Sequence, residues 1–344
     1  MTDMTRLERA KEQYLRGDPD GAADELEALL EAEPGLTEPQ VLLARCYSRM
    51  RQPADAVAEL DEVLAREPGH PEALALRGAE HYFEDELDEA EEKLKQALAA
   101  QPGLVEAQVR LAQVHTDRKE FDDAEAVLAA GVETAADNAD DLALVRMGQV
   151  YLAMQRRDSD GALTIISENE HLWEGRPYVA STVRSNQAII YARRRDYGQA
   201  KELLIDALDL DPYFHMARGL LGQVALLQKD YQLAADQLQQ VVENGDEVSA
   251  YAYYSLGASL QALKRPLEAL PYYQAALDRG LSGFPAVTAR VAVAIPDVNM
   301  RYALLAVFVA ALAWLALRVF SPLLALALVA VVGVFGFQIV RGGR

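Results

Sequence analysis

The sequence predicts an all-α protein in which a superhelical solenoid of antiparallel helix pairs is followed by a transmembrane helical hairpin. Three observations carry this prediction. A proline returns every 34 residues, at Pro34, Pro68 and Pro102. Small residues recur with the same period in two columns. Near the end of the chain, the 39 residues 302–340 contain a single charged side chain, Arg318. A period of 34 residues is typical of stacked helix-turn-helix repeats.

The repeats are expected to cover residues 1–281 in about eight helix pairs. The first small column is Ala10, Ala44, Gly78, Ala112, Gly148, Ala188, Gly222 and Gly257. The second, 12 residues later in every repeat except the fifth, is Ala22, Ala56, Ala90, Ala124, Ala162, Ala200, Ala234 and Ala269. An apolar position four residues further on reads Leu26, Leu60, Leu94, Leu128, Ile166, Leu204, Leu238 and Tyr273. Small residues let two helices cross closely, and large ones fill the space one turn away.

The middle of the array departs from the period. From Ala136 to Pro212 the chain runs 76 residues, two repeats of 34 plus eight. Insertions are expected around residues 156–161 and 167–177, where charged residues, Gly and Pro interrupt the apolar pattern. The longer interval from Gly148 to Ala162, 14 residues, agrees with the first of them.

These columns and the closing proline resemble the tetratricopeptide repeat (TPR) family over residues 3–281. The resemblance implies a concave surface, lined by the first helix of each repeat, that binds a peptide or helix of a partner protein. Carried over by position, the residues on that surface are Arg110, Gln113, Arg146, Gln149, Asn186, Arg193, Gln223, Tyr251 and Tyr254. For each of them the alternative is an ordinary solvated side chain. The Lys and Asn set with which chaperone-docking members of the family clamp a C-terminal carboxylate has no match here.

The apolar segment 302–340 is too long for one straight membrane helix. As a continuous helix it would measure about 58 Å, roughly twice the hydrocarbon thickness of a bilayer. Division near Ser321 gives two spans, 302–320 and 322–340, each about 28 Å long. The residues assigned to this anchor are Tyr302, Trp314, Arg318 and Pro322. The alternatives are one span with an interfacial remainder and a buried soluble helix pair.

Basic residues and prolines around the spans suggest the topology. Residues 282–301 contain two prolines around a β-branched run and are expected to form a linker near the membrane surface. Arg301 precedes the first span, and the basic tail 341–344 follows the second, which places both ends in the cytoplasm. The N-terminus lacks the apolar core of a signal peptide. We therefore expect a C-terminally anchored membrane protein, in a bacterial inner membrane, with a cytoplasmic repeat array.

Composition and motifs argue against several functions. The formal net charge of −20 argues against nucleic acid, because phosphate binding needs Lys and Arg to displace counterions. Such an acidic surface either keeps the solenoid soluble or recruits a basic partner. No phosphate-binding loop or zinc spacing is present, so no cofactor, metal or catalytic residue is predicted. His81 and His115 share one repeat position, 34 residues apart, and are expected to be packing residues.

The sequence thus predicts a noncatalytic, membrane-anchored scaffold that collects protein partners at the cytoplasmic face, in assembly or quality control of an envelope complex. The alternative is an integral accessory subunit of a larger membrane complex, with the hairpin packed on other subunits. An enzyme with an unrecognised site is the third hypothesis.

Overall fold

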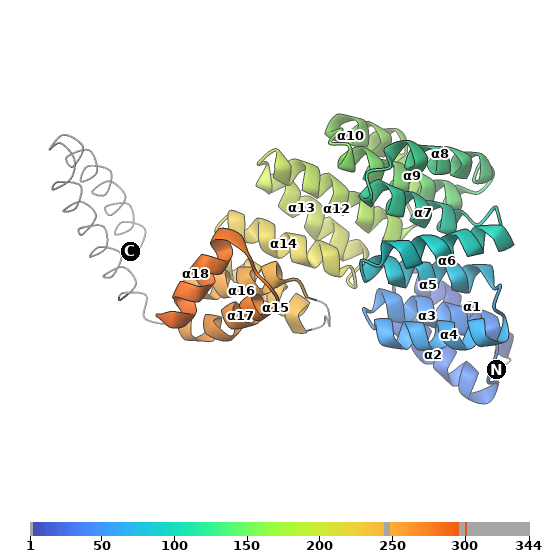
Figure 1. The fold of residues 1–344 in the computed structure, drawn as a ribbon, viewed down its shortest axis with the longest axis horizontal. Coiled ribbons are helices and arrows are strands. Elements are labelled where there is room, and N and C mark those ends of the chain that lie inside the picture. The colour runs from blue at the N-terminus through green and yellow to red at the C-terminus, as the bar shows by residue number, and fades with distance from the viewer. Residues whose placement is uncertain (1–2, 244–247, 296–299, 301–344) are drawn as a thin grey trace. The chain divides into compact units, whose positions relative to one another are not determined.

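A computed structural model describes residues 3–243, 248–295 and 300, and in these residues the regular structure is entirely helical (Figure 1). The helices are α1 (Asp3–Leu15), α2 (Pro19–Ala32), α3 (Thr37–Arg49), α4 (Pro53–Arg66), α5 (Pro71–Phe83), α6 (Leu87–Ala100), α7 (Val105–Asp117), α8 (Phe121–Thr134), α9 (Ala139–Gln155), α10 (Ser159–Glu168), α11 (Glu170–Trp173), α12 (Pro177–Arg193), α13 (Tyr197–Leu210), α14 (His215–Leu227), α15 (Tyr231–Glu243), α16 (Ala250–Ala262), α17 (Pro266–Asp278) and α18 (Gly283–Ala294).

Consecutive helices pack as pairs, from α1 with α2 to α16 with α17, which gives eight repeats within the described part of the chain. The short α11 stands between the fifth and sixth pairs, and α18 packs on α17. The chain divides into two compact units, Met1–Val248 and Ser249–Arg344. We call them the N-terminal unit and the C-terminal unit and describe each by itself.

The predicted columns form the core between the helices. All eight alanines of the second column are fully buried, at 0% exposure, and the large residues four positions later are buried as well. An alanine at the crossing lets the two helices of a repeat approach, and the leucine one turn further on fills the gap beside it. Burying one such leucine contributes about 1.5–3 kcal/mol.

A short turn joins the two helices of every repeat. Its central residue has a positive φ, between 63° and 87°, in all eight repeats. These left-handed residues are Gly17, Arg51, Asp85, Lys119, Arg157, Arg195, Lys229 and Lys264. The next residue is the N-cap of the second helix, and the carboxylates of Asp18, Asp158 and Asp196 accept a backbone N–H there. The turn therefore ends one helix and starts the next within three residues.

The two predicted insertions are wrong. The turn that contains Arg157 has the same form as the others, and residues 167–177 hold only the break between α10 and α11. The eight extra residues instead lengthen the first helices of two repeats, because α9 and α12 have 17 residues each, whereas α7 and α14 have 13. Four residues add about one helical turn, so the helix grows while the connecting turn stays unchanged.

The same shift corrects the first small column in the fifth repeat. The small residue lies seven positions before the left-handed residue in the other repeats, and in the fifth repeat that position is Val150. A Cβ on Gly78 or Gly222 would clash with a leucine of the same repeat, at 2.8 and 2.6 Å. A Cβ on Gly148 would instead lie 2.8 Å from Leu128 of the preceding repeat. Gly148 therefore serves the contact between repeats.

The segment expected to be a linker, 282–301, contains a packed helix, α18. Ala286, Ala289 and Ala292 recur every three residues and are buried, on a helix that packs against α17. Thr288 also donates a hydrogen bond to the hydroxyl of Tyr254, at 3.0 Å. Pro285 suggested a break, but proline is tolerated in the first turn of a helix, where the backbone N–H has no partner to lose.

No helix in the ranges 3–243 and 248–295 combines the length and the apolar character needed to cross a membrane. The predicted spans 302–320 and 322–340 lie outside the described residues, as do the tail 341–344 and the four anchor residues Tyr302, Trp314, Arg318 and Pro322.

Candidate functional site

The inner face of the N-terminal unit gathers charged residues from repeats that are distant in sequence. Arg45 on α3 donates two hydrogen bonds to the carboxylate of Glu106 on α7, at 2.8 and 2.5 Å. Both side chains are 22% exposed. A bidentate pair of this kind is stronger than a single contact and fixes the angle between its two partners. It therefore ties the second repeat to the fourth across the inner face.

A second ion pair joins still more distant parts. Arg49, at the end of α3, donates to Asp211 after α13, at 2.8 Å, although the two residues are 162 positions apart. Their side chains are only 9% and 2% exposed. The guanidinium also donates to the carbonyl of Tyr14 and lies over the rings of Tyr14 and Tyr178, at 5.1 and 5.5 Å. Arg49 is thus held by groups from three separate repeats.

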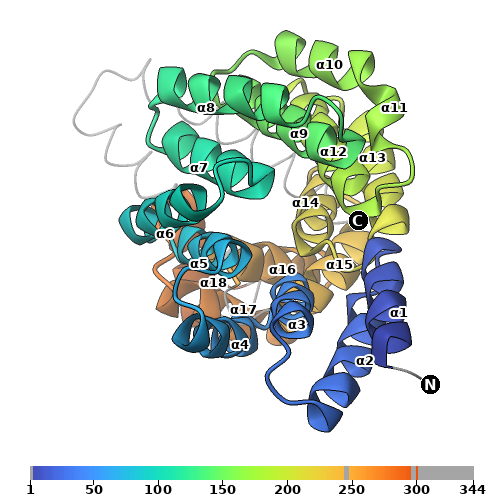
Figure 2. The ribbon, with the colours of Figure 1, turned by 90° about the vertical axis from the view of Figure 1, so that its right-hand side faces the viewer.

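These contacts close the N-terminal unit on itself. A Cβ on Gly17, in the turn after α1, would lie 3.8 Å from the Cβ of Pro177 at the start of α12. Figure 2 shows the blue α1 beside the yellow-green end of α13. We define the inner cluster as Tyr14, Arg45, Arg49, Glu106, Arg110, Tyr178 and Asp211. It fills the face that a peptide groove would use in these repeats.

The inner cluster keeps its ions charged. Burial disfavours the cation of Arg45, but the carboxylate of Glu106 outweighs this effect and raises the pKa of Arg45. Burial likewise opposes the Glu106 carboxylate, but Arg45 and Arg110 hold its pKa below the usual range. Glu80 on α5 behaves in the opposite way, because burial raises its pKa while Ser48, which donates a 2.5 Å hydrogen bond, only partly offsets this.

Arg110 and Gln113, two of the predicted groove residues, belong to this cluster or contact it. The Arg110 guanidinium donates to Gln113 at 3.1 Å and lies over the ring of Phe83 at 5.5 Å. Burial opposes its charge, but Tyr178 and Glu106 raise the pKa of Arg110 overall. Arg110 is therefore engaged by its own chain.

The next predicted residues form a similar pair one repeat on. Arg146 donates to Gln149 at 2.8 Å, and Arg184 on α12 repeats this arrangement with Gln187 at 3.2 Å. The Nε of Arg146 is buried without a hydrogen-bond partner. Asn186 is buried, at 6% exposure, and is not available to a peptide. Gln223 on α14 is half-buried.

Tyr251 and Tyr254 lie in the C-terminal unit. The ring of Tyr254 is 5.9 Å from that of Tyr251 and 5.8 Å from that of Tyr273, and its hydroxyl accepts the hydrogen bond from Thr288. Tyr254 is therefore a packing residue beneath α18. Tyr251 is about half exposed.

Arg193 is exposed and lies at a different place from Arg110 and Arg146. It lines a hollow together with Lys119 and Arg157, two of the left-handed turn residues. Sequence reasoning missed this site, although the signal was present. Six of the eight left-handed positions carry Arg or Lys, and the spacing that marks the repeats also marks this basic column.

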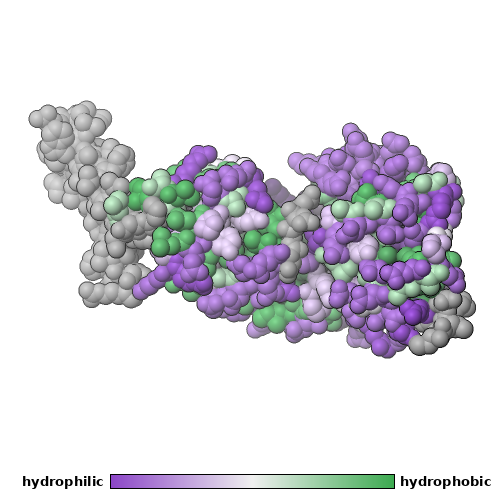
Figure 3. Space-filling view, turned by 90° about the horizontal axis from the view of Figure 1, so that it is seen from below, coloured by the Kyte–Doolittle hydropathy of each residue, from purple (hydrophilic) through white to green (hydrophobic). Residues whose placement is uncertain are grey.

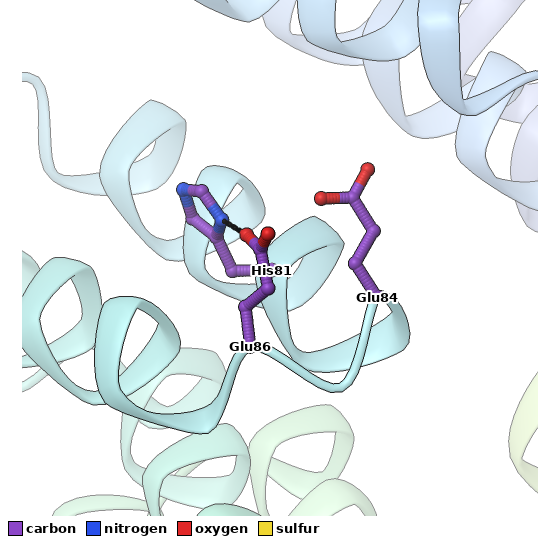
Figure 4. A group of neighbouring side chains, drawn as sticks. All are labelled: His81, Glu84 and Glu86. Carbon is purple, nitrogen blue, oxygen red and sulfur yellow. Dashed lines mark hydrogen bonds and ion pairs between the residues drawn. The ribbon is translucent and has the colours of Figure 1, made fainter.

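The two histidines at equivalent positions hold their turns together. His81 and His115 each pair through Nδ1 with the N-cap glutamate of the following helix, Glu86 at 2.7 Å and Glu120 at 2.6 Å. Figure 4 shows Glu86 directed at the His81 ring, with the Glu84 carboxylate turned elsewhere. His and carboxylates within 4.8 Å of one another could ligate a metal ion, but these hydrogen bonds already account for the imidazoles.

The rest of the surface is strongly polar. On the face drawn in Figure 3, hydrophilic side chains cover most of the area and hydrophobic ones form small patches between them. This agrees with a formal charge of −20 spread over solvated helix faces.

The helix pairs, their 34-residue period and their alanine crossings define a helical repeat solenoid. Models of the tetratricopeptide repeat family match residues 14–79, 84–146 and 185–249. The chain belongs to the TPR family.

Solved structures share this fold. A chain from the crystal structure of the APC/C hetero-tetramer Cut9-Hcn1 is similar, with 14% sequence identity and a TM-score of 0.61, and the match covers 84% of this chain but 55% of that one. The human IFIT1 dimer with PPP-AAAA is similar with 15% identity and a TM-score of 0.56, covering 81% of this chain and 70% of that chain. At these identities the likeness concerns the fold alone. No curated protein matches the chain.

Proposed function

We propose that this protein is a noncatalytic scaffold that holds partner proteins and is anchored in a membrane by its C-terminal segment. A repeat solenoid presents long, continuous surfaces, which suit an extended protein partner better than a small substrate. The apolar segment 302–340 supports the anchor, and the basic residues beside it support a cytoplasmic repeat array. Assembly or quality control of an envelope complex is the role that we propose for such a scaffold.

The observation that carries this proposal is how the solenoid uses its buried charges. The most buried ion pair of the N-terminal unit, Arg49 with Asp211, joins distant repeats to one another. Arg45 and Glu106 do the same. These charges serve the frame of the solenoid, and the surfaces around it remain for partners.

A second candidate function is that of an integral subunit of a larger membrane complex. Arg318 favours it, because a charged side chain inside a bilayer is costly unless it faces protein or water. In that case Trp314 and Arg318 would contact other subunits rather than lipid.

Copurification after mild detergent extraction tests the proposal. A tagged full-length chain is expected in the membrane fraction with partners in variable, substoichiometric amounts. A chain ending at Met300 is the matched control and is expected to leave the membrane fraction. A fixed stoichiometry that depends on the C-terminal segment would favour the integral subunit. Recovery of the full-length chain in the soluble fraction, or without reproducible partners, would contradict the scaffold.

A further inference from the structure

The hollow around Arg193 lies where the turns of the fourth and fifth repeats meet the end of α12. It measures about 740 Å³, and its walls include Lys119, Arg156, Arg157 and Arg193. Phe121 and Met154 add apolar surface. Ligand pockets in proteins typically have volumes of about 300–1,000 Å³. We call this hollow the basic pocket.

One of these cations is neutralised within the solenoid. Arg156, the C-cap of α9, pairs with Glu125 at 2.7 Å and lies over the ring of Phe121 at 5.7 Å. The C-caps of the neighbouring repeats behave in the same way, because Arg118 pairs with Glu91 and Arg194 with Asp160. These C-cap arginines form a ladder from each repeat to the preceding one.

The other three cations are uncompensated. In the described part of the chain, the side chains of Lys119, Arg157 and Arg193 have no hydrogen-bond or ion-pair partner, and all three are exposed. Lys119 and Arg157 have φ values of 65° and 64°, so the turn fixes the direction in which each side chain leaves the backbone.

Nearby carboxylates are already engaged. Asp117 accepts hydrogen bonds from the hydroxyls of two tyrosines, Glu120 pairs with His115, and Asp158 caps α10. The pocket therefore carries an excess of positive charge on a protein whose formal charge is −20. This excess is complementary to carboxylates, and the apolar surface is complementary to a hydrophobic side chain between them.

We propose that the basic pocket binds a short acidic segment of a partner protein, with carboxylates at Lys119, Arg157 and Arg193 and an apolar side chain against Phe121 and Met154. This inference rests on the proposed scaffold function and names the chemistry of the partner. A few cations in one hollow suit a few carboxylates. A nucleic acid would need a longer run of cations and would meet the acidic remainder of the surface.

The test uses purified full-length protein and a fluorescent peptide of alternating glutamate and phenylalanine. The pocket variant is Lys119→Gln, Arg157→Gln and Arg193→Gln. The matched control is Arg51→Gln, Lys229→Gln and Lys264→Gln, which removes the same charge from left-handed turn positions elsewhere. Circular dichroism and thermal melting check that both variants fold, as expected for exposed side chains.

We expect the pocket variant to weaken peptide binding at least about tenfold and the control variant to change it less than about threefold. Added salt should weaken binding by the wild type. A peptide with glutamine in place of glutamate should not compete. Equal loss in both variants, no binding of the acidic peptide, or tighter binding of a single-stranded RNA at the same residues would overturn the proposal. If partners still copurify from membranes in those cases, the scaffold function stands and only the pocket assignment fails.

Discussion

At the scale of single residues, identical types do different work according to the space around them. Gly219 and Gly222 lie on the same helix, α14, within one turn of each other. A Cβ on Gly222 would meet Leu238 at 2.6 Å, whereas a Cβ on Gly219 would meet nothing within 4 Å. Glycine is thus required at one position and is merely present at the other.

This difference predicts opposite effects for the same substitution. Gly222→Ala is expected to destabilise the protein by about 1–3 kcal/mol through overpacking, although alanine is the better helix former. Gly219→Ala should instead stabilise it by up to about 1 kcal/mol. Urea unfolding of both variants checks this prediction, and equal effects would show that the crossing at Leu238 is looser than the geometry implies.

The buried glutamates Glu106 and Glu80 also differ, and this predicts a dependence on pH. Glu106 has a lowered pKa, so its contribution to stability is present above the ordinary glutamate pKa of about 4.5 and is lost as the pH falls through its lower folded value. Glu106→Gln should cost about 3–5 kcal/mol at neutral pH, because Arg45 is left buried without its partner. The variant should also lose less stability on acidification than the wild type does.

Glu80 is the control for that prediction. Burial raises its pKa, so its ionisation costs stability as the pH rises through that raised value, and an amide removes the cost. Glu80→Gln should therefore be neutral or stabilising at neutral pH. Melting temperatures measured from mild acid to neutral pH compare the two variants, and a loss in Glu80→Gln as large as that in Glu106→Gln would contradict the account.

At the scale of elements, the turn between paired helices is the most regular feature of the solenoid. Seven of its eight left-handed residues are not glycine. A left-handed conformation costs an L-residue roughly 1–2 kcal/mol. Basic side chains at this place lie close to the C-terminus of the first helix, where the helix dipole favours positive charge.

Lys229, with a φ of 65°, allows a direct test of the turn. Lys229→Ile should lower stability by about 1–2 kcal/mol, because a β-branched side chain is poorly compatible with this conformation. Lys229→Gly should cost little, because glycine adopts it freely. Thermal melting compares the two variants with the wild type. A lower melting temperature for the glycine variant than for the isoleucine variant would mean that another interaction decides this position.

The sequence predicted the elements well wherever a residue type has one possible role. The alanines at the helix crossings and the leucines beside them all lie where the repeat pattern placed them. The phase failed at Gly148 because a glycine can serve either a contact within a repeat or one between repeats. The four extra residues in α9 and α12 were assigned to loops because helix lengthening leaves no mark in the connecting turns.

The candidate site was predictable only in part. Arg110 and Gln113 were correctly assigned to one helix, but their engagement by Phe83 and Tyr178 depends on contacts between repeats. The pair of Arg49 with Asp211 joins residues 162 positions apart, and no local pattern indicates it. Whether Arg193 and the other groove residues bind a partner stays a prediction.

At the scale of the molecule, the central claim concerns the N-terminal unit. Its inner face is closed by the chain itself, because the turn after α1 meets the start of α12 and the end of α13. A partner would therefore meet the turn edge, with its uncompensated cations, before the inner cluster. Removing one partner of the most buried ion pair should cost more than removing an exposed one, since the other charge would stay buried and unpaired.

Disulfide formation across the closure tests this claim most directly. In a Cys46→Ala background, Gly17→Cys and Pro177→Cys would place two Cβ atoms 3.8 Å apart, within the range of about 3.5–4.5 Å that a disulfide needs. The control pair is Gly69→Cys with Pro177→Cys, since a Cβ on Gly69 would have no neighbour within 4 Å. The account predicts that mild oxidation consumes both thiols of the first pair in the monomer and leaves the control pair free. Free thiols in the first pair, in a chain with unchanged circular dichroism, would contradict the closed inner face.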